Sequence, residues 1–180
     1  MARPTHTHGS REARLERLAR SIDALLEKDE LLLRRSREID GLRRAAAADL
    51  HAICGEFVSA LNRILAQSAV QLDPPVPAGD YFRDDAPNLI QINVRGRILQ
   101  IQFQATGELV STEDFRVPYT LEGTVRAFNQ ELLDKDLIEE QLIFFTLEKD
   151  KQMWRYFDPR TYRSAAFDVE YLIGLLEQLI

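Results

Sequence analysis

The sequence predicts an α+β protein: a long N-terminal coiled-coil-like helix, then a small antiparallel-sheet domain with helices packed on one face. Two observations lead to this fold class. Apolar residues recur at steps of three and four through the first part of the chain, which is typical of a helix with one apolar side. Beyond a proline-rich stretch, short segments alternate between apolar and polar residues, as half-buried strands do.

Charge and proline content divide the chain. Residues 1–72 carry a net charge of +2 and residues 73–180 carry −8, which together make the overall −6. Such an asymmetry indicates two parts with different surfaces. We therefore expect four segments: a mobile tail at 1–10, a long helix or helical hairpin at 11–70, a proline-rich connector at 71–80, and an α+β domain at 81–180.

The helical period is the strongest pattern in the chain. Alternate steps of three and four residues from Leu15 meet an apolar residue at every second position as far as Ala60. A period sustained over more than four heptads predicts a coiled-coil seam. Asp29, Ser36 and Arg43 interrupt the other positions, and polar residues in a seam lower stability but can fix register. We predict self-association or binding of a partner helix through Leu18, Ile22, Leu25, Leu32, Ile39, Leu50 and Ile53.

Near Gly41 the sequence allows two alternatives, a continuous helix or a helical hairpin. Asp40 and Gly41 could end one helix and start a hairpin. A glycine inside a helix costs only ~1 kcal/mol relative to alanine, and the apolar period keeps its phase across this position. We favour a continuous or merely kinked helix, in which the small residues 45–48 would allow a neighbouring helix to approach closely.

The segment LIQINVRGRILQIQFQ, residues 89–104, predicts a β-hairpin. If Val94 pairs with Arg97, a two-residue turn of Arg95 and Gly96 remains, and glycine readily adopts a positive φ. This register places on one face Ile90, Ile92, Val94, Leu99, Ile101 and Phe103. We expect that face to cover the C-terminal helix. The opposite face is rich in glutamine, and it can be solvated or receive a partner.

The rest of the domain supplies the other expected elements. A third strand is predicted at 116–128, with Pro118 confining its start to an edge or bulge. A helix at 129–140, strands at 141–148 and 152–158 around a turn at 149–151, and a helix at 167–180 follow. Asp168 is the expected N-cap of the last helix. Its buried face is expected to consist of Tyr171, Leu172, Leu175, Leu176 and Leu179.

Sequence motifs for catalysis or cofactor binding are missing. The eight glycines form no phosphate-binding loop, and no serine-hydrolase motif occurs. Cys54 is the single cysteine, so it has no internal disulfide partner, and we interpret it as a buried apolar residue. His51 is the one histidine in a predicted helix or strand, which leaves too few ligands for a typical metal site. We expect no cofactor or metal and favour a non-enzymatic protein.

One cluster of side chains is a candidate ligand or partner patch. It combines aromatic rings with guanidinium groups, which can stack on bases, grip phosphates or form contacts between proteins. Its residues are Trp154, Arg155, Tyr156, Arg160, Tyr162 and Arg163. The simpler alternative is a strand whose aromatic residues fill the core, followed by a turn with solvated arginines. The acidic charge of this part of the chain disfavours nucleic acid.

Three hypotheses about function remain. The first is an interaction or oligomerisation module that presents the α+β domain on its helical seam. The second is a small ligand-binding or catalytic domain that uses the arginine and aromatic patch. For the third, the expected order of one helix, three strands, a helix, two strands and a helix is similar to that of the small acidic chaperones of bacterial secretion systems. That resemblance, from which the long seam departs, implies a chaperone that holds an extended client.

No secretory signal or membrane span is expected, because no uninterrupted apolar segment approaches the ~18 residues that a spanning helix needs. We therefore expect the protein to reside in the cytoplasm without a membrane partner.

Overall fold

The computed structural model describes residues 7–77, 82–113, 115–148 and 151–180. The chain divides into two compact units, one that ends at Asp40 and one that comprises Gly41–Ile180. The second unit contains the whole sheet. The α+β fold class with a long N-terminal helix is confirmed.

Helix α1 runs from Thr7 to Ile64 without a break at Gly41. The continuous helix favoured from the sequence is thus correct, and a helical hairpin is not formed. The helix starts inside the expected tail, whose residues 1–6 lie outside the described residues, and it ends six residues before position 70. Asn62 links the end of α1 to the next strand, because its side-chain oxygen accepts hydrogen bonds from the amides of Ala69 and Val70, both at 3.1 Å.

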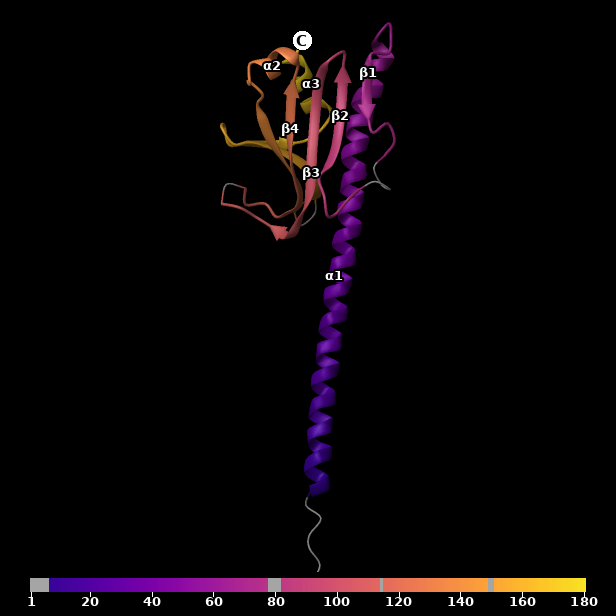
Figure 1. The fold of residues 1–180 in the computed structure, drawn as a ribbon, viewed down its shortest axis with the longest axis vertical. Helices are drawn as coiled ribbons and strands as arrows, with labels where there is room; N and C mark the ends of the chain where they lie inside the picture. Colours follow the sequence, from indigo (N-terminus) through magenta and orange to yellow (C-terminus); the bar gives the residue numbers. More distant parts are fainter. Residues whose placement is uncertain (1–6, 78–81, 114, 149–150) are drawn as a thin grey trace, which may run out of the picture. The chain divides into compact units, whose positions relative to one another are not determined.

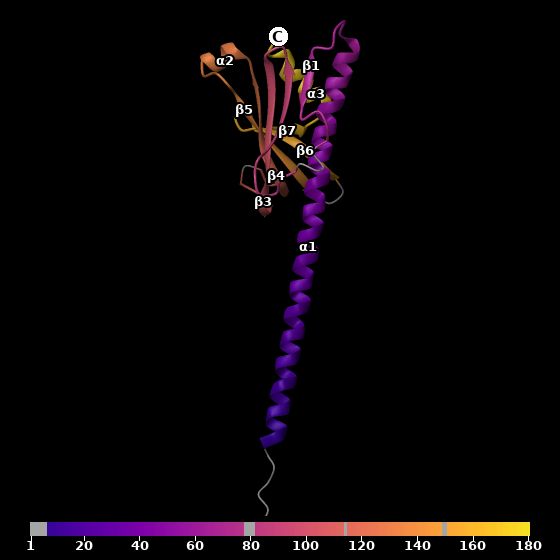
Figure 2. The same ribbon diagram turned by 45° about the vertical axis from the view of Figure 1, so that its right-hand side comes forward.

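In the described residues that follow, seven antiparallel strands form a meander in which every strand pairs with its neighbours in sequence. The strands are β1 (Val70–Asp73), β2 (Asn88–Val94), β3 (Arg97–Val110), β4 (Tyr119–Phe128), β5 (Glu140–Glu148), β6 (Lys151–Asp158) and β7 (Arg163–Ala166). Figure 1 shows β1 to β4 side by side, and Figure 2 labels β5, β6 and β7. Two short helices complete the unit: α2 (Gln130–Asp134) and α3 (Val169–Glu177).

The hairpin of β2 and β3 has the predicted register, with Val94 opposite Arg97 and Asn88 opposite Phe103. Arg95 and Gly96 form the turn with φ angles of 51° and 86°, which is the left-handed geometry that a two-residue hairpin loop requires. The side chain of Asn93 stabilises this turn by accepting a hydrogen bond of 2.9 Å from the Gly96 amide. Five of the six apolar side chains predicted for the inner face are buried, and Val94 packs against them.

Two strands and the length of one helix were not predicted correctly. Strand β1 occupies 70–73, where the connector was expected to begin, and it forms an edge of the sheet beside β2. Strand β7 at the other edge was not expected either. The helix expected at 129–140 is only the five-residue α2, because Asp136 adopts a φ of 53° and Glu140 already belongs to β5. The connector residues 78–80 and turn residues 149–150 lie outside the described residues.

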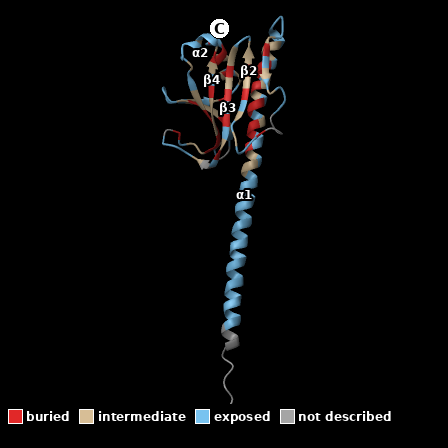
Figure 3. Cartoon of the chain, viewed as in Figure 1, coloured by how far each residue is buried: buried red, intermediate tan, exposed pale blue. Residues whose placement is uncertain are grey.

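The main core lies between one face of the sheet, helix α3 and the part of α1 after Gly41. Figure 3 shows buried residues on this part of α1 and exposed residues along its earlier part. The apolar face of the hairpin therefore belongs to a core that contains part of α1 as well as the C-terminal helix. Only the C-terminal helix was expected to lie against this face. Helix α3 agrees with its prediction, since the Asp168 carboxylate caps it by accepting from the Tyr171 amide at 3.0 Å. Its predicted apolar face is buried except for Tyr171, which is half-buried.

Candidate functional site

The exposed part of α1 carries an apolar stripe. Seven large side chains, each between 46% and 60% exposed, lie on one side of the helix at 3.6 residues per turn. These residues, called the leucine stripe below, are Leu15, Leu18, Ile22, Leu25, Leu26, Leu32 and Leu33. Leu31 is also exposed but points to the opposite side of the helix, because it follows Leu26 by five residues. Four of the predicted seam residues belong to this stripe.

The other predicted seam residues have different surroundings. Ile39 is half-buried, Leu50 has no exposed surface and Ile53 packs against the core of the sheet domain. Arg43, which interrupts the apolar period, is buried and donates a hydrogen bond of 2.9 Å to the Thr120 hydroxyl. From Arg43 onward, then, the period contacts the chain's own sheet.

The predicted arginine and aromatic patch is not one surface. Trp154 is buried in the core, where its indole nitrogen donates a hydrogen bond of 2.7 Å to the carbonyl of Ala46. The ring of Tyr156 stacks on that of Tyr171 at 4.2 Å between centroids, on the same inner side of the sheet. These two aromatic residues therefore stabilise the fold, as the simpler alternative proposed.

The arginines of this patch interact with neighbouring groups. Arg155 donates to the Ser164 hydroxyl at 3.2 Å. Arg160 forms two hydrogen bonds with the carboxylate of Glu139, and this interaction lowers the Glu139 pKa. Tyr162, which is 68% exposed, and Arg163, also exposed, lie at the surface. The six residues are consequently distributed over both faces of the sheet and the turn after β6.

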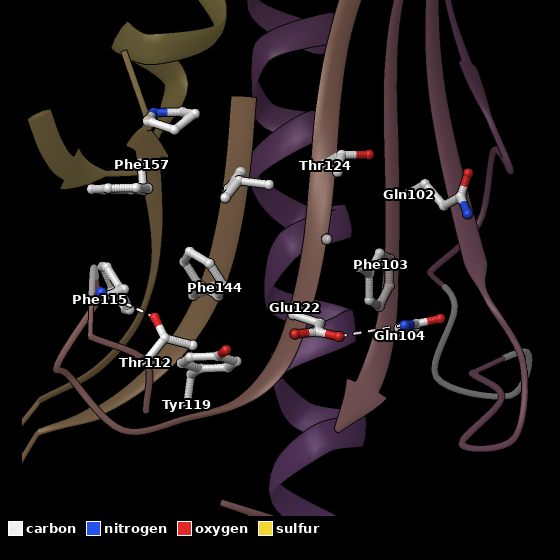
Figure 4. Close-up of a pocket in the computed structure, with 13 residues that line it drawn as sticks. Gln102, Phe103, Gln104, Thr112, Phe115, Tyr119, Glu122, Thr124, Phe144 and Phe157 are labelled. Atoms are coloured by element: carbon white, nitrogen blue, oxygen red, sulfur yellow. Dashed lines mark hydrogen bonds between the residues drawn. The ribbon is translucent and has the colours of Figure 1, made fainter. Parts of the chain in front are cut away.

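A pocket that the sequence analysis missed lies on the outer face of the sheet, opposite the main core. It has a volume of about 530 Å³ and is bordered by β3, β4, β5, the end of β6 and the segment between β3 and β4 (Figure 4). Its lining comprises Gln102, Phe103, Gln104, Thr112, Phe115, Tyr119, Glu122, Gly123, Thr124, Leu142, Phe144, Phe157 and Pro159. We call this cavity the outer-face pocket.

The floor of the outer-face pocket is an aromatic cluster. Phe115 stacks on Phe144 at 4.5 Å between ring centroids, and Tyr119 also lies 4.5 Å from Phe144. Phe157 meets Phe115 edge-on at 5.8 Å. These four residues form a second buried cluster, separate from the main core. The sheet therefore has apolar packing on both faces.

An irregularity in β4 places Tyr119 in this cluster. Leu121 and Val125 face the main core, and strict alternation would put Tyr119 on the same inner face. The register between β4 and β5 shifts between Tyr119 and Leu121, and an extra residue in a strand re-aims the side chains beyond it. The tyrosine ring consequently packs on Phe144 at the outer face, which no sequence pattern indicates.

The segment between β3 and β4 holds Phe115 over the outer face. The Thr112 hydroxyl accepts a hydrogen bond of 3.0 Å from the Phe115 amide, and the Thr112 amide donates to the Phe115 carbonyl at 2.9 Å. The Pro118 carbonyl accepts from the amide of Leu147 in β5 at 2.8 Å. These bonds fix the segment as one wall of the pocket.

Glycine at position 123 is required where β4 runs beside β3 under the pocket. A Cβ atom at Gly123 would contact the Gln102 carbonyl oxygen and would lie 2.8 Å from the Phe103 Cα. Real Cβ atoms do not approach backbone atoms so closely, so any other residue would push the two strands apart.

Polar side chains form the opposite side of the pocket. Glu122 is half-buried, and the Gln104 amide donates a weak hydrogen bond of 3.4 Å to its carboxylate. Thr124 lies beside it on β4 (Figure 4). Burial, and to a smaller extent the charge of Glu122, raises the Tyr119 pKa, so this hydroxyl keeps its proton at neutral pH. Within the described residues the Tyr119 hydroxyl makes no hydrogen bond, which leaves it free to donate to a ligand.

In the described part of the chain, no group of side chains is arranged to bind a metal ion, and the cysteine is buried. No three His, Cys, Asp or Glu side chains there are grouped closely enough to hold a metal ion. Cys54 is fully buried, as expected, and burial raises the pKa of its thiol to about 12. His51 is also buried, with Nε2 at 2.7 Å from the Pro74 carbonyl oxygen. A neutral thiol without access to solvent is a poor nucleophile.

A signal for the second apolar face was present in the sequence. Leu142, Ile143, Phe144 and Phe145 form a continuous apolar run within β5, and such runs are typical of strands that are buried on both sides. The run indicates covered outer-face residues, although it does not reveal the segment that covers them.

No known protein family, no curated protein and no solved structure matches this chain. With β1 and β7 included, the observed order is one helix, four strands, a helix, three strands and a helix, which departs further from the order of the secretion chaperones. Among the described residues, no helix combines the length and apolar character needed to cross a membrane.

Proposed function

We propose that the protein is a non-enzymatic interaction module that self-associates, with the leucine stripe of α1 packing against the stripe of a second copy. The observation that carries this proposal is the exposure of seven leucine and isoleucine side chains on one side of a single helix. Large exposed apolar patches on a soluble protein commonly mark interaction sites. A helix with such a side is stabilised when another apolar helix covers it.

The energetics favour a second copy as the partner. Completing the burial of a half-exposed leucine contributes about 1 kcal/mol. A twofold pair buries both stripes, so its fourteen side chains contribute roughly 14 kcal/mol, which can offset the ~4–15 kcal/mol lost on association. A polar partner helix would supply only half of this amount.

Light scattering coupled to size exclusion tests the proposal with the full chain. We expect a mass of about twice 20.7 kDa at micromolar concentration. Replacing both Leu25 and Leu32 with aspartate buries unpaired charges in the contact and should return the mass to that of one chain.

Leu31→Asp is the matched control for this experiment, because it makes the same chemical change on the opposite side of the same helix. We expect this variant to retain the mass of the associated form. A wild-type chain that stays monomeric up to high micromolar concentration contradicts self-association, as does a Leu31→Asp variant that dissociates as completely as the double variant.

Asp29 provides a second test, in which a substitution should strengthen self-association instead of disrupting it. It occupies a position of the apolar period between Ile22 and Ser36, on the side of the stripe. Asp29→Leu should strengthen association about tenfold, because a desolvated carboxylate is replaced with an apolar contact. Sedimentation equilibrium measures the dissociation constant, and an unchanged or weakened association would show that position 29 lies outside the contact.

A further inference from the structure

The outer-face pocket sets an apolar floor against one uncompensated negative charge. Glu122 is the single acidic or basic residue in the described lining. Among the described residues, its one hydrogen bond is the 3.4 Å contact from Gln104, and no Lys or Arg there pairs with it. A half-buried carboxylate without a cation is stabilised by a ligand that brings one.

Glu140, on the same face of the sheet, has the cationic partner that Glu122 lacks. Its carboxylate accepts a hydrogen bond of 2.6 Å from Nε of Arg126, the residue opposite it on β4. The two carboxylates belong to neighbouring strands, β4 and β5; Glu140 is exposed and Glu122 is half-buried. The cation is therefore missing at Glu122 specifically, next to the cavity, and present at Glu140, which does not line it.

The other residues of the pocket determine the chemistry of the uncharged part of the ligand, called its body below. Phe115, Phe144 and Phe157 are buried, and their ring edges form the apolar side of a cavity of about 530 Å³, a volume in the range of pockets for small molecules. On the side of Glu122, the Tyr119 hydroxyl and the Gln104 side chain can form hydrogen bonds. A ligand that satisfies both sides is amphiphilic.

We infer that the outer-face pocket binds a small organic cation, in which a primary ammonium group contacts the Glu122 carboxylate and an aromatic body packs on Phe115, Phe144 and Phe157. The ammonium would supply the opposite charge that Glu122 lacks. The aromatic body would replace water over the exposed edges of the phenylalanine rings. A carboxylate ligand is disfavoured, because Glu122 would repel it.

Titration of the full chain with three phenyl-bearing probes tests the inference. The probes are 2-phenylethylammonium, neutral 2-phenylethanol and anionic 3-phenylpropanoate, followed through the backbone amide NMR signals of Gln104, Thr124 and Phe144. We expect saturable binding of the ammonium at least about tenfold tighter than that of the alcohol, since a hydrogen bond to a charged group is worth more than a neutral one. The propanoate should bind most weakly.

Two variants and one control connect the binding to the pocket. Glu122→Gln should remove the preference for the ammonium and leave binding of the alcohol unchanged, whereas the control Glu140→Gln should alter neither. Thr124→Trp, which places a large ring at the pocket wall, should weaken both probes. Leu25→Asp combined with Leu32→Asp should leave binding intact, because the inference does not depend on self-association.

Several outcomes would overturn this inference. Equal affinity for the ammonium and the alcohol would show that Glu122 contributes nothing, and tighter binding of the propanoate would reverse the assigned charge. Unaltered ammonium binding in Glu122→Gln, or in Thr124→Trp, would place the bound molecule elsewhere on the chain. Lack of saturation in the millimolar range would show that the cavity binds no ligand of this class.

Discussion

The two ends of the apolar period in α1 have opposite surroundings. Between Leu15 and Leu33 the large side chains are about half exposed, whereas Leu50, Cys54 and Phe57 are at most 1% exposed. The spacing of apolar residues is the same in both segments. A helical period therefore identifies the side of a helix that is expected to be buried. It does not show whether a sheet of the same chain or another molecule packs against that side.

Side-chain size explains part of the difference. Ala46 and Ala47 are buried, and their small side chains let the sheet come close enough for Trp154 to reach the Ala46 carbonyl. The sequence predicted that these alanines would admit a neighbouring helix, and a strand residue occupies that place instead. The leucine stripe has no comparable small residues at its centre, so its large side chains would hold a neighbouring element farther from the helix backbone.

The largest expected effect contrasts Leu50→Ala with Leu25→Ala. Truncation of the fully buried Leu50 should lower the free energy of unfolding by about 3–5 kcal/mol, through lost burial and a cavity. The same change at exposed Leu25 should cost less than about 0.5 kcal/mol in the sheet domain. Urea unfolding followed by the fluorescence of Trp154, the single tryptophan, measures both values.

Protein concentration must be kept low in that comparison, so that self-association does not add to the stability of the wild type. Similar losses for the two variants at low concentration would show that the two ends of the period are not energetically different. A loss at Leu25 that emerges only at high concentration would instead support the proposed pairing of two stripes.

An intermediate effect concerns the pH dependence that Cys54 adds to the buried segment. Burial raises the pKa of its thiol from 9.0 to about 12, so above pH 9 the unfolded chain loses a proton that the folded chain keeps. The contribution is therefore fully present below pH 9 and falls by up to about 1.4 kcal/mol per pH unit above it. The stability difference between wild type and Cys54→Ala should change by roughly 1.4 kcal/mol between pH 8 and pH 10.

Urea titrations of both proteins at three pH values test this dependence, and other titrating groups cancel because both proteins contain them. The wild type should lose stability relative to the variant as the pH rises. A difference that stays constant with pH would mean that the thiol ionises in the folded chain as it does in the unfolded one.

The smallest expected effect lies at Gly41, the first residue of the second unit. This exposed helical glycine has no atoms near the position of a Cβ, so Gly41→Ala should stabilise the helix by about 1 kcal/mol. Circular dichroism during thermal unfolding detects the gain. Gly96→Ala is the control with the opposite sign, because its φ of 86° strains any side chain. If Gly41→Ala also destabilises the protein, α1 is not helical at this point.

Much of the sheet domain followed from local patterns. The hairpin register between Ile90 and Ile101 was predictable because one face is apolar, and a shift by one residue would expose it. Asp168 was predictable as a cap because its carboxylate can accept from the first free amides of a helix. Strands β1 and β7 were missed because edge strands of four residues carry too few apolar side chains to form a pattern.

The outer-face pocket could be predicted only in part. The apolar run around Phe144 indicates that both faces of β5 are covered, but the covering residue, Phe115, lies in an irregular segment without periodicity. The residues of the candidate patch around Trp154 are separated in the structure by the geometry of the strand itself. Neighbours in a strand alternate between faces, so Trp154 and Arg155 point to opposite sides of the sheet.

The sequence by itself determined the elements whose causes are local: the continuous α1, the two-residue turn at Gly96, and the alternation that separates the faces of β2 and β3. Only the tertiary structure decided what covers each apolar surface, because burial depends on contacts between residues far apart in the chain. Leu25 and Leu50 both belong to the apolar period of one helix, yet sheet packing buries only the second. The pocket at Glu122 likewise arises where four strands and a loop converge.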